Sequence, residues 1–253
     1  MSKVPIVVEG SNLTGAWIDI LELLIKNRGE LSPLVLTLTD FEEIVKAKKV
    51  LSKHLEANRM PSIDEVAETI FPYSLYEYAE FDRDVLYDKY KKNLRRVKKI
   101  SPSNRNGTYF SRLIAFNDTS EPINQLEIII SALRSKKSVR RSKLQAGIFD
   151  PTADHTNSRM QGFPCLQHVT FFRTKDGKLI INSFYAVQFF IKRAYGNWLG
   201  LVNLGKFIAQ ETGLELKRFN CFIGAEVLDN IKVPEARVLL NDMVAKSNKD
   251  ELI

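Results

Sequence analysis

The feature that most constrains this chain is an alternating hairpin whose first strand begins at a cysteine. From Cys165 to Tyr185, side chains alternate along two strand-like segments around Asp176-Gly177, a dipeptide typical of tight hairpin turns. Both faces of the first segment are partly apolar, which predicts a sheet covered on both sides. A helix with an apolar stripe is predicted next, from about Val187 to Thr212. Because Pro164 precedes it and a strand follows it, the Cys165 thiol has a fixed backbone and is a candidate nucleophile.

The N-terminal half of the chain predicts short strands and helices without an internal repeat. Leu34–Leu38 has the apolar pattern of a buried strand, and Asp40 is predicted to begin the helix that follows it. Ser62 and Glu65 have the spacing of a capping box, in which each residue satisfies a free backbone N–H at a helix start.

The middle of the chain also predicts a helix, a short strand and a loop. Pro122 suits the first turn of a helix with an apolar stripe. A strand is expected from Lys143 to Phe149, followed by a polar loop over residues 152–162. The simplest account is a single α+β domain over residues 1–253, with a mixed sheet covered by helices.

Composition excludes several classes of protein. Hydrophobic residues make up 44% of the 253 residues, enough for a sizeable core. Two distant cysteines predict neither a disulfide framework nor a zinc site, and three irregularly spaced histidines argue against a metal cluster. No apolar run reaches the ~18 residues of a membrane span, so we expect a soluble, cytoplasmic protein. The net charge of +7 favours an anionic partner.

The most charged segment, residues 74–100, has two interpretations. Its second half carries lysines and arginines near tyrosines, as nucleic-acid-binding helices do. The alternative is an amphipathic helix whose tyrosines and leucines face the core while its charges face solvent. Asp82, Asp84 and Asp88 interleave with the basic residues, and this favours the amphipathic helix over a nucleic-acid interface.

Residues 121–230 carry a series of short motifs in one order. They are Ile123-Asn124-Gln125, Arg140-Arg141, Pro164-Cys165, Asp176-Gly177-Lys178-Leu179, Gly196-Asn197 and Ile223-Gly224, with a weaker upstream match at Phe110-Ser111-Arg112-Leu113. Together they resemble thymidylate synthase and the related pyrimidine hydroxymethylases. The resemblance implies a thymidylate-synthase-like fold, with residues 1–120 as a divergent N-terminal part and residues 121–230 as the best-matching core.

The resemblance also implies an activity, the transfer of a methyl or hydroxymethyl group to C5 of a pyrimidine nucleotide or nucleoside. In that family a thiolate adds to C6 of the pyrimidine, and 5,10-methylenetetrahydrofolate supplies the one-carbon unit. Cys165 matches the nucleophile, and Asn197 matches the residue that recognises the base. Arg140 and Arg141 match paired arginines that bind phosphate in the partner subunit's site, which implies a homodimer.

Each of these residues also has a purely structural interpretation. A free cysteine such as Cys165 is commonly a small buried apolar residue. Asn197 is equally a polar residue within a glycine-containing bend of the helix. Arg140 and Arg141, next to Lys136 and Lys137, are equally a solvated basic turn.

Other positions of the family's site have lost their polar groups. The arginine that binds phosphate and keeps the thiol ionised is Ala186 here, and the phosphate-binding serine beside it is Val187. A water-network aspartate is Phe189, the histidine after the nucleophile is Leu166, and a histidine of the following strand is Val227. All five replacements weaken the expected nucleotide site.

Two charged groups of the family's site, the activating arginine and the catalytic glutamate, have no matched residue in this sequence. Lys192 or Arg193, about one helical turn beyond Ala186, would replace the missing arginine unless the helix directs both side chains to solvent. The family's catalytic glutamate has no matched position, although Glu127 and Glu226 lie near the expected elements.

Two functions of different classes therefore remain open. The first is a divergent methyl- or hydroxymethyltransferase that uses Cys165 as its nucleophile. The second is a dimer of the same fold that has lost catalysis and binds a nucleotide or acts as a scaffold for a protein partner. The retained Cys165 favours the enzyme, whereas the apolar replacements favour the impaired dimer.

Overall fold

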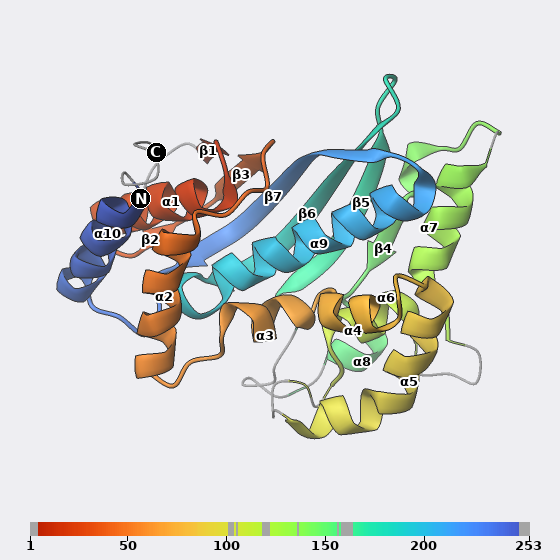
Figure 1. The fold of residues 1–253 in the computed structure, drawn as a ribbon, viewed down its shortest axis with the longest axis horizontal. Helices are drawn as coiled ribbons and strands as arrows, with labels where there is room; N and C mark the ends of the chain where they lie inside the picture. The colour runs from red at the N-terminus through yellow and green to blue at the C-terminus, as the bar shows by residue number, and fades with distance from the viewer. Residues whose placement is uncertain are drawn as a thin grey trace.

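The fold combines helices and strands, and a computed structural model describes residues 5–100, 104, 106–117, 122–135, 137–155, 157 and 164–247 of the chain. In order (Figure 1), the elements are β1 (Ile6–Gly10), α1 (Leu13–Lys26), β2 (Glu30–Leu31), β3 (Leu34–Leu38), α2 (Val45–Ala57), α3 (Ile63–Glu68), α4 (Tyr73–Tyr78), α5 (Arg83–Ile100), α6 (Tyr109–Ile114), α7 (Gln125–Arg134), the 3-10 helix η2 (Arg141–Lys143), β4 (Gln145–Gly147), α8 (Pro151–Asp154), β5 (Leu166–Arg173), β6 (Lys178–Phe189), the π-helix η3 (Phe190–Ala194), α9 (Tyr195–Thr212), β7 (Glu215–Val227) and α10 (Val233–Ser247).

The strands form one mixed sheet in the order β1-β3-β7-β6-β5-β4, with β2 paired to the C-terminal end of β7. β1 with β3 and β6 with β7 are parallel, whereas the other neighbouring strands are antiparallel. Leu34, Leu36 and Leu38 of β3 are fully buried, as their apolar pattern predicts. The predicted α+β class and mixed sheet are confirmed, and the buried side chains form one hydrophobic core.

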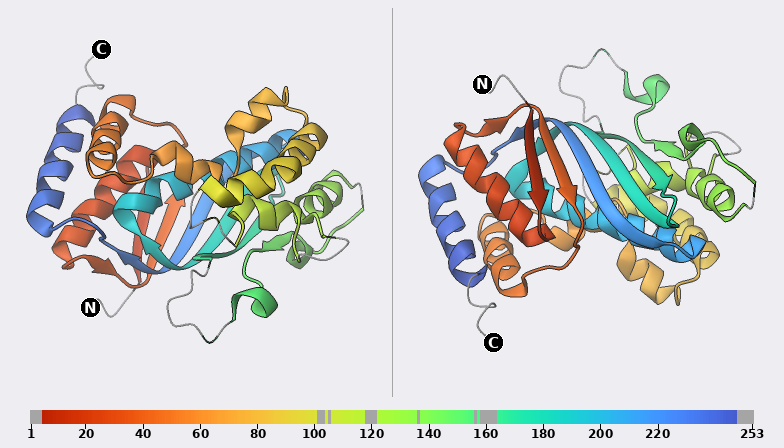
Figure 2. Two further views of the ribbon diagram at one scale, coloured as in Figure 1. Left: turned by 90° about the horizontal axis from the view of Figure 1, so that it is seen from below. Right: turned by 90° about the horizontal axis from the view of Figure 1, so that it is seen from above.

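The long helices lie on one face of the sheet, and much of the other face is open in the described part of the chain, with the short helix α8 apart from the rest (Figure 2). α9 packs along β6 and β7, and α1 packs on β1 and β3. On the open face, 40% of the Phe222 surface and 62% of the Val7 surface remain exposed. The expectation of a sheet covered on both sides is therefore wrong for the residues that the structure describes, because among them no helix packs against the exposed Phe222 and Val7.

One of the two helix starts predicted in the N-terminal half is confirmed. Ser62 and Glu65 form the expected capping box at the start of α3, where the Ser62 hydroxyl accepts from the Glu65 N–H at 3.1 Å. Asp40 does not begin α2, which starts only at Val45. Its carboxylate accepts from the Glu42 N–H at 3.0 Å instead, so it stabilises a turn ahead of the helix.

The start of α7 also differs from the prediction. Pro122 lies upstream of the helix, which begins at Gln125. Asn124 is the capping residue, and its side chain accepts from the Glu127 N–H at 3.1 Å. An asparagine cap stabilises a helix start by satisfying a free N–H, which a proline cannot do.

The strand and loop predicted after α7 are both shorter than expected. β4 covers only Gln145–Gly147 of the segment expected from Lys143 to Phe149. α8 occupies the first part of the segment predicted as a polar loop, with Asp150 as its cap. Residues 156 and 158–162 of that predicted loop lie outside the described residues.

The hairpin of β5 and β6 is confirmed, and Gly177 at its turn has a φ of +77°, which a glycine tolerates without strain. The next helix begins later than predicted, because β6 continues through Val187 to Phe189. A single π-helical turn then connects β6 to α9. Gly213 ends α9 in the left-handed conformation, with a φ of +66°, as expected for a helix stop.

The charged segment 74–100 forms α4 and the long helix α5. Tyr76, Leu86, Tyr87 and Tyr90 are buried, as the amphipathic interpretation predicts, whereas Tyr78 is exposed. Among the helices of the described residues, none is both long enough and apolar enough to cross a membrane.

Candidate active site

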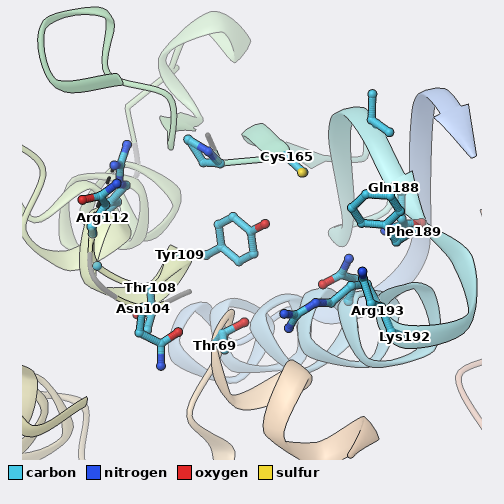
Figure 3. Close-up of a pocket in the computed structure, with 15 residues that line it drawn as sticks. Thr69, Asn104, Thr108, Tyr109, Arg112, Cys165, Gln188, Phe189, Lys192 and Arg193 are labelled. Carbon is cyan, nitrogen blue, oxygen red and sulfur yellow. Dashed lines mark hydrogen bonds between the residues drawn. The ribbon is translucent and has the colours of Figure 1, made fainter. Parts of the chain in front are cut away.

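A cavity of about 350 Å³ opens where β6 gives way to α9. Its walls come from the end of α3, the start of α6, the start of β5, the end of β6 and the first turns after it (Figure 3). The side chains in its lining that carry the argument below are Tyr109, Cys165, Gln188, Lys192, Arg193 and Asn197. Two of the predicted site residues, Cys165 and Asn197, are therefore brought together in one cavity.

Cys165 is held at the cavity wall by the backbone around it. Its carbonyl accepts from the Ala186 N–H at 3.0 Å, which fixes the start of β5 against β6. The Gln167 side-chain amide donates to the Pro164 carbonyl at 2.6 Å. Burial raises the pKa of the Cys165 thiol, and the positive charges of Arg193 and Lys192 oppose that rise. The pKa of the thiol is raised overall, so the two nearby cations offset only part of the effect of burial.

Tyr109 lies at the centre of the cavity lining, and the sequence analysis did not single it out (Figure 3). It is the first residue of α6, whose start is fixed by reciprocal hydrogen bonds between Thr108 and Ser111. Burial raises the pKa of Tyr109 to about 12, and hydrogen bonds to the backbone of Leu166 and Cys165 oppose the rise. The weak motif at Phe110–Leu113, directly after Tyr109, is the sequence signal that points to this segment.

Asn197 reaches the cavity because α9 packs unusually closely on α3. A Cβ atom on Gly196 would lie 2.6 Å from the Ile63 carbonyl oxygen, so only glycine permits this approach. The Asn197 side chain is buried to 4% exposure, and no hydrogen bond to its amide occurs among the described residues. It lies in the first turn of a regular helix and not at a bend. Its amide is therefore available to a ligand in the cavity.

Gln188 of the cavity lining belongs to a group of buried polar side chains on β6 and β7. Gln188 accepts from the Trp198 indole N–H at 3.1 Å, which fixes its amide orientation and leaves its Nε2 atom without a partner in the described residues. Gln188 pairs in register with Glu226, whose two carboxylate oxygens are also buried and unpartnered there. Burial raises the pKa of Glu226 well above its ordinary value, and the nearby Asp229 charge adds to the rise.

Arg140 and Arg141 do not line this cavity. The Arg141 guanidinium lies over the ring of Phe172 in β5, 4.2 Å from its centroid, near the edge strand β4. Arg140 precedes the short 3-10 helix η2 and is exposed, as is Lys137, whereas Lys136 lies outside the described residues. Within one chain, the predicted phosphate-binding arginines are therefore separate from Cys165.

The replaced family positions fall into two groups. Val187 and Phe189 line the cavity, with 38% and 40% of their surface exposed. Ala186 is exposed but does not line it, Leu166 is fully buried in the core, and Val227 pairs with Phe189 in the sheet. The cavity mouth is thus more apolar than a phosphate site.

Of the two glutamates considered for catalysis, Glu127 lies elsewhere. It accepts from the Arg83 Nε atom at 3.0 Å, in an ion-pair network that also contains Glu211. Glu226 pairs in register with Gln188 of the cavity lining but does not itself line the cavity. Within the ranges that the structure describes, no group of three or more His, Cys, Asp or Glu side chains is arranged to hold a metal ion.

Comparison with known proteins supports the resemblance seen in the motifs. No protein-family model matches the sequence. Over 178 residues, however, the chain is 28% identical to a curated protein of Methanocaldococcus jannaschii named "Putative thymidylate synthase", and the match covers 70% of this chain and 72% of that relative. This similarity supports the resemblance to thymidylate synthase, and the mixed sheet covered by helices is consistent with a thymidylate-synthase-like fold.

Proposed function

We propose that this protein transfers a methyl or hydroxymethyl group to C5 of a pyrimidine nucleotide or nucleoside, with Cys165 as its nucleophile. The observation that carries the proposal is the shared cavity of Cys165 and Asn197, which come from separate elements of the sheet and its helix. A nucleophile beside a fixed hydrogen-bonding amide is what addition to C6 of an oriented pyrimidine requires.

The electrostatics of the cavity support the same chemistry. Lys192 and Arg193 lie in the lining with Cys165, so the cavity keeps positive charge although Ala186 replaces the expected arginine. That charge favours both a thiolate and an anionic ligand. Asn197 offers one donor and one acceptor group to the edge of a base.

The cavity mouth also fits a flat ring system. Phe189 and Val187 both line the cavity and remain substantially exposed there. Exposed aromatic and branched side chains at a cavity mouth provide an apolar surface against which a planar ring packs. When bound, 5,10-methylenetetrahydrofolate would supply the one-carbon unit, and Phe189 and Val187 are the residues that would hold its ring.

We further propose that the active form is a homodimer built on the open face of the sheet. His168, Phe184 and Phe222 stack across β5, β6 and β7, with ring centroids 6.0 and 5.4 Å apart. A second copy on this face would bury these rings. Arg141 lies over Phe172 of β5 and outside its own chain's cavity, which suits a residue that serves the partner's site.

A covalent adduct tests the proposed chemistry directly. The protein is incubated with a 5-fluoropyrimidine deoxynucleotide and 5,10-methylenetetrahydrofolate, and peptide mass spectrometry locates the modified residue. We expect an adduct on Cys165 in the wild-type protein and none in the Cys165→Ser variant. Cys221 is an internal control, because it is fully buried and must remain unmodified. No adduct on Cys165 with uracil or cytosine nucleotides, tested as 5-fluoro analogues, would exclude the proposal.

The alternative function, a dimer that binds a nucleotide without turnover, is favoured by one observation. The exposed Val187 and Phe189 occupy cavity positions where a nucleotide phosphate needs polar ligands. If this alternative is right, calorimetry will show nucleotide binding that is the same in wild type and Cys165→Ser, with no adduct. Turnover that Cys165→Ser abolishes would exclude it.

A further inference from the structure

The turn between β6 and α9 places two successive cations beside Cys165. Residues Phe190–Ala194 form a π-helical turn, an uncommon conformation that is frequent at functional sites. The Ile191 N–H donates to the Asp229 carboxylate at 2.8 Å, which ties this turn to the end of the sheet. Figure 3 shows Lys192 and Arg193 side by side at the cavity, with Cys165 across from them.

Lys192 already has partners of its own. Its Nζ atom lies 3.7 Å from the Asp229 carboxylate and 4.2 Å from the centroid of the Phe189 ring. Asp229 is buried and accepts from Ile191 and Asn230, so it is held in place. The charge of Lys192 is therefore largely balanced by a fixed carboxylate.

Arg193 has no such partner. No hydrogen bond and no ion pair to its guanidinium occurs among the described residues, although the side chain is partly buried in the cavity lining. The other arginine of the lining, Arg112, is paired with the buried carboxylate of Asp154. Of the cations in this lining, Arg193 is thus the one whose charge no described carboxylate balances.

We propose that Arg193 is the activating residue of Cys165 and supplies, from the π-helical turn, the positive charge that Ala186 no longer provides. This inference rests on the proposed role of Cys165 as a nucleophile. The guanidinium stabilises the thiolate across the cavity, whereas Lys192 serves to anchor the turn through Asp229. In this chain the activating positive charge comes from Arg193 in the turn after β6, and not from the β6 position that Ala186 occupies.

The pH dependence of thiol alkylation tests this assignment without any nucleotide. Iodoacetamide alkylation of Cys165 is followed across pH by peptide mass spectrometry, which separates it from Cys221. We expect Arg193→Gln to slow alkylation by about three- to tenfold below the thiol pKa and to move the profile to higher pH. Arg193→Lys, which keeps the charge, is expected to retain most of the rate. Lys192→Gln and the distant Arg141→Gln serve as matched controls that each remove one positive charge.

Each outcome decides between the two cations. An unchanged profile in a folded Arg193→Gln protein overturns the proposal, as does a larger effect of Lys192→Gln. Circular dichroism and thermal unfolding verify folding, and Arg193→Lys keeps the test decisive if the glutamine variant unfolds. A shifted profile in Arg193→Gln, with no fluoropyrimidine adduct in wild type, would uphold Arg193 as the activating residue and reject the proposed reaction.

Discussion

At the scale of single residues, the ion pair of Arg112 and Asp154 holds the wall of the cavity next to Tyr109. Arg112 donates from Nη2 to Asp154 Oδ1 at 2.7 Å and from Nη1 to the Ile148 carbonyl at 2.9 Å. The Asp154 carboxylate, only 2% exposed, also accepts from the Asp150 N–H at 2.8 Å. A carboxylate this deeply buried depends on its cation, because an unpaired buried charge is strongly unfavourable.

We therefore predict that Arg112→Met lowers the free energy of unfolding by about 3–5 kcal/mol, because it leaves Asp154 buried without a cation. Urea denaturation followed by circular dichroism measures the change. Lys26→Met is the matched control, because its partner Glu22 and Lys26 itself are both exposed, and it should leave the unfolding midpoint unchanged. Equal midpoints for wild type and Arg112→Met would show that the pair does not hold this wall.

Glu226 gives a second residue-scale prediction, on pH. Burial and the charge of Asp229 raise its pKa in the folded protein above the ordinary 4.5. Below pH 4.5 both the folded and the unfolded states carry the neutral acid. Above it, the unfolded state releases a proton that the folded state retains, so stability falls by up to about 1.4 kcal/mol per pH unit until the folded group ionises. Glu226→Gln has no carboxyl at this position, so its stability does not fall with pH for this reason.

The expected result is that Glu226→Gln gains thermal stability relative to wild type as the pH rises above 4.5. Thermal unfolding at a series of pH values, with the exposed Glu9→Gln as control, measures the difference. Parallel curves for wild type and Glu226→Gln would contradict a buried neutral acid.

The sequence pointed to Cys165 through its place after Pro164 at the start of a strand, and to Asn197 through the resemblance to the thymidylate synthase family. It missed Tyr109, since nothing local distinguishes a tyrosine that faces a cavity from one that faces the core. It also left Lys192 and Arg193 equivalent. The choice between them depends on Asp229, which lies far along the chain and is brought near only by the pairing of β6 with β7.

At the scale of elements, α9 depends on glycines for its close contact with α3. A Cβ on Gly196 would lie 2.6 Å from both the Ile63 carbonyl oxygen and the Val66 Cβ atom. A Cβ on Gly200 would lie 2.7 Å from the Ala67 carbonyl oxygen. Backbone oxygens cannot move aside, so α9 must shift away from α3 if either glycine gains a side chain.

We predict that Gly196→Ala destabilises the protein by about 1–3 kcal/mol, although alanine favours a helix by about 1 kcal/mol over glycine. Chemical denaturation gives the change in stability, and Gln210→Ala on the exposed side of α9 serves as control. The shift should also displace Asn197, so nucleotide affinity measured by calorimetry should fall in folded Gly196→Ala. A more stable Gly196→Ala protein would show that a Cβ atom fits between α9 and α3 without a steric clash.

The elements themselves were predicted best where one local signal dominates. The capping box of Ser62 and Glu65, the Asp176-Gly177 turn and the Gly213 helix stop need only residues close in sequence. The extension of β6 to Phe189 and the π-helical turn after it depend instead on pairing with β7 and on the Asp229 contact. Such long-range contacts leave no periodic pattern in the local sequence.

At the scale of the whole molecule, one face of the sheet is open in the described part of the chain. A ladder of polar hydrogen bonds crosses the face from Thr37 through Asn220 and Asn182 to Thr170, at 3.1, 2.7 and 3.0 Å. It runs beside the stacked rings of His168, Phe184 and Phe222. Side chains ordered across four strands form a regular, rigid surface, and its exposed aromatic rings favour burial against a matching face.

We predict that the wild-type protein is a dimer in solution and that Phe222→Glu makes it monomeric. In a two-fold dimer each substitution acts twice, and it places carboxylates in a buried apolar contact without partners. Sedimentation or light scattering gives the mass, and circular dichroism shows whether the variant is folded. Val238→Glu is the matched control, because Val238 is an exposed valine of α10, on the helical side of the sheet, and its variant should remain dimeric. A monomeric wild type would exclude the dimer, and a folded Phe222→Glu dimer would place the subunit contact elsewhere. Either result would leave Arg141 without the proposed role in the partner's cavity.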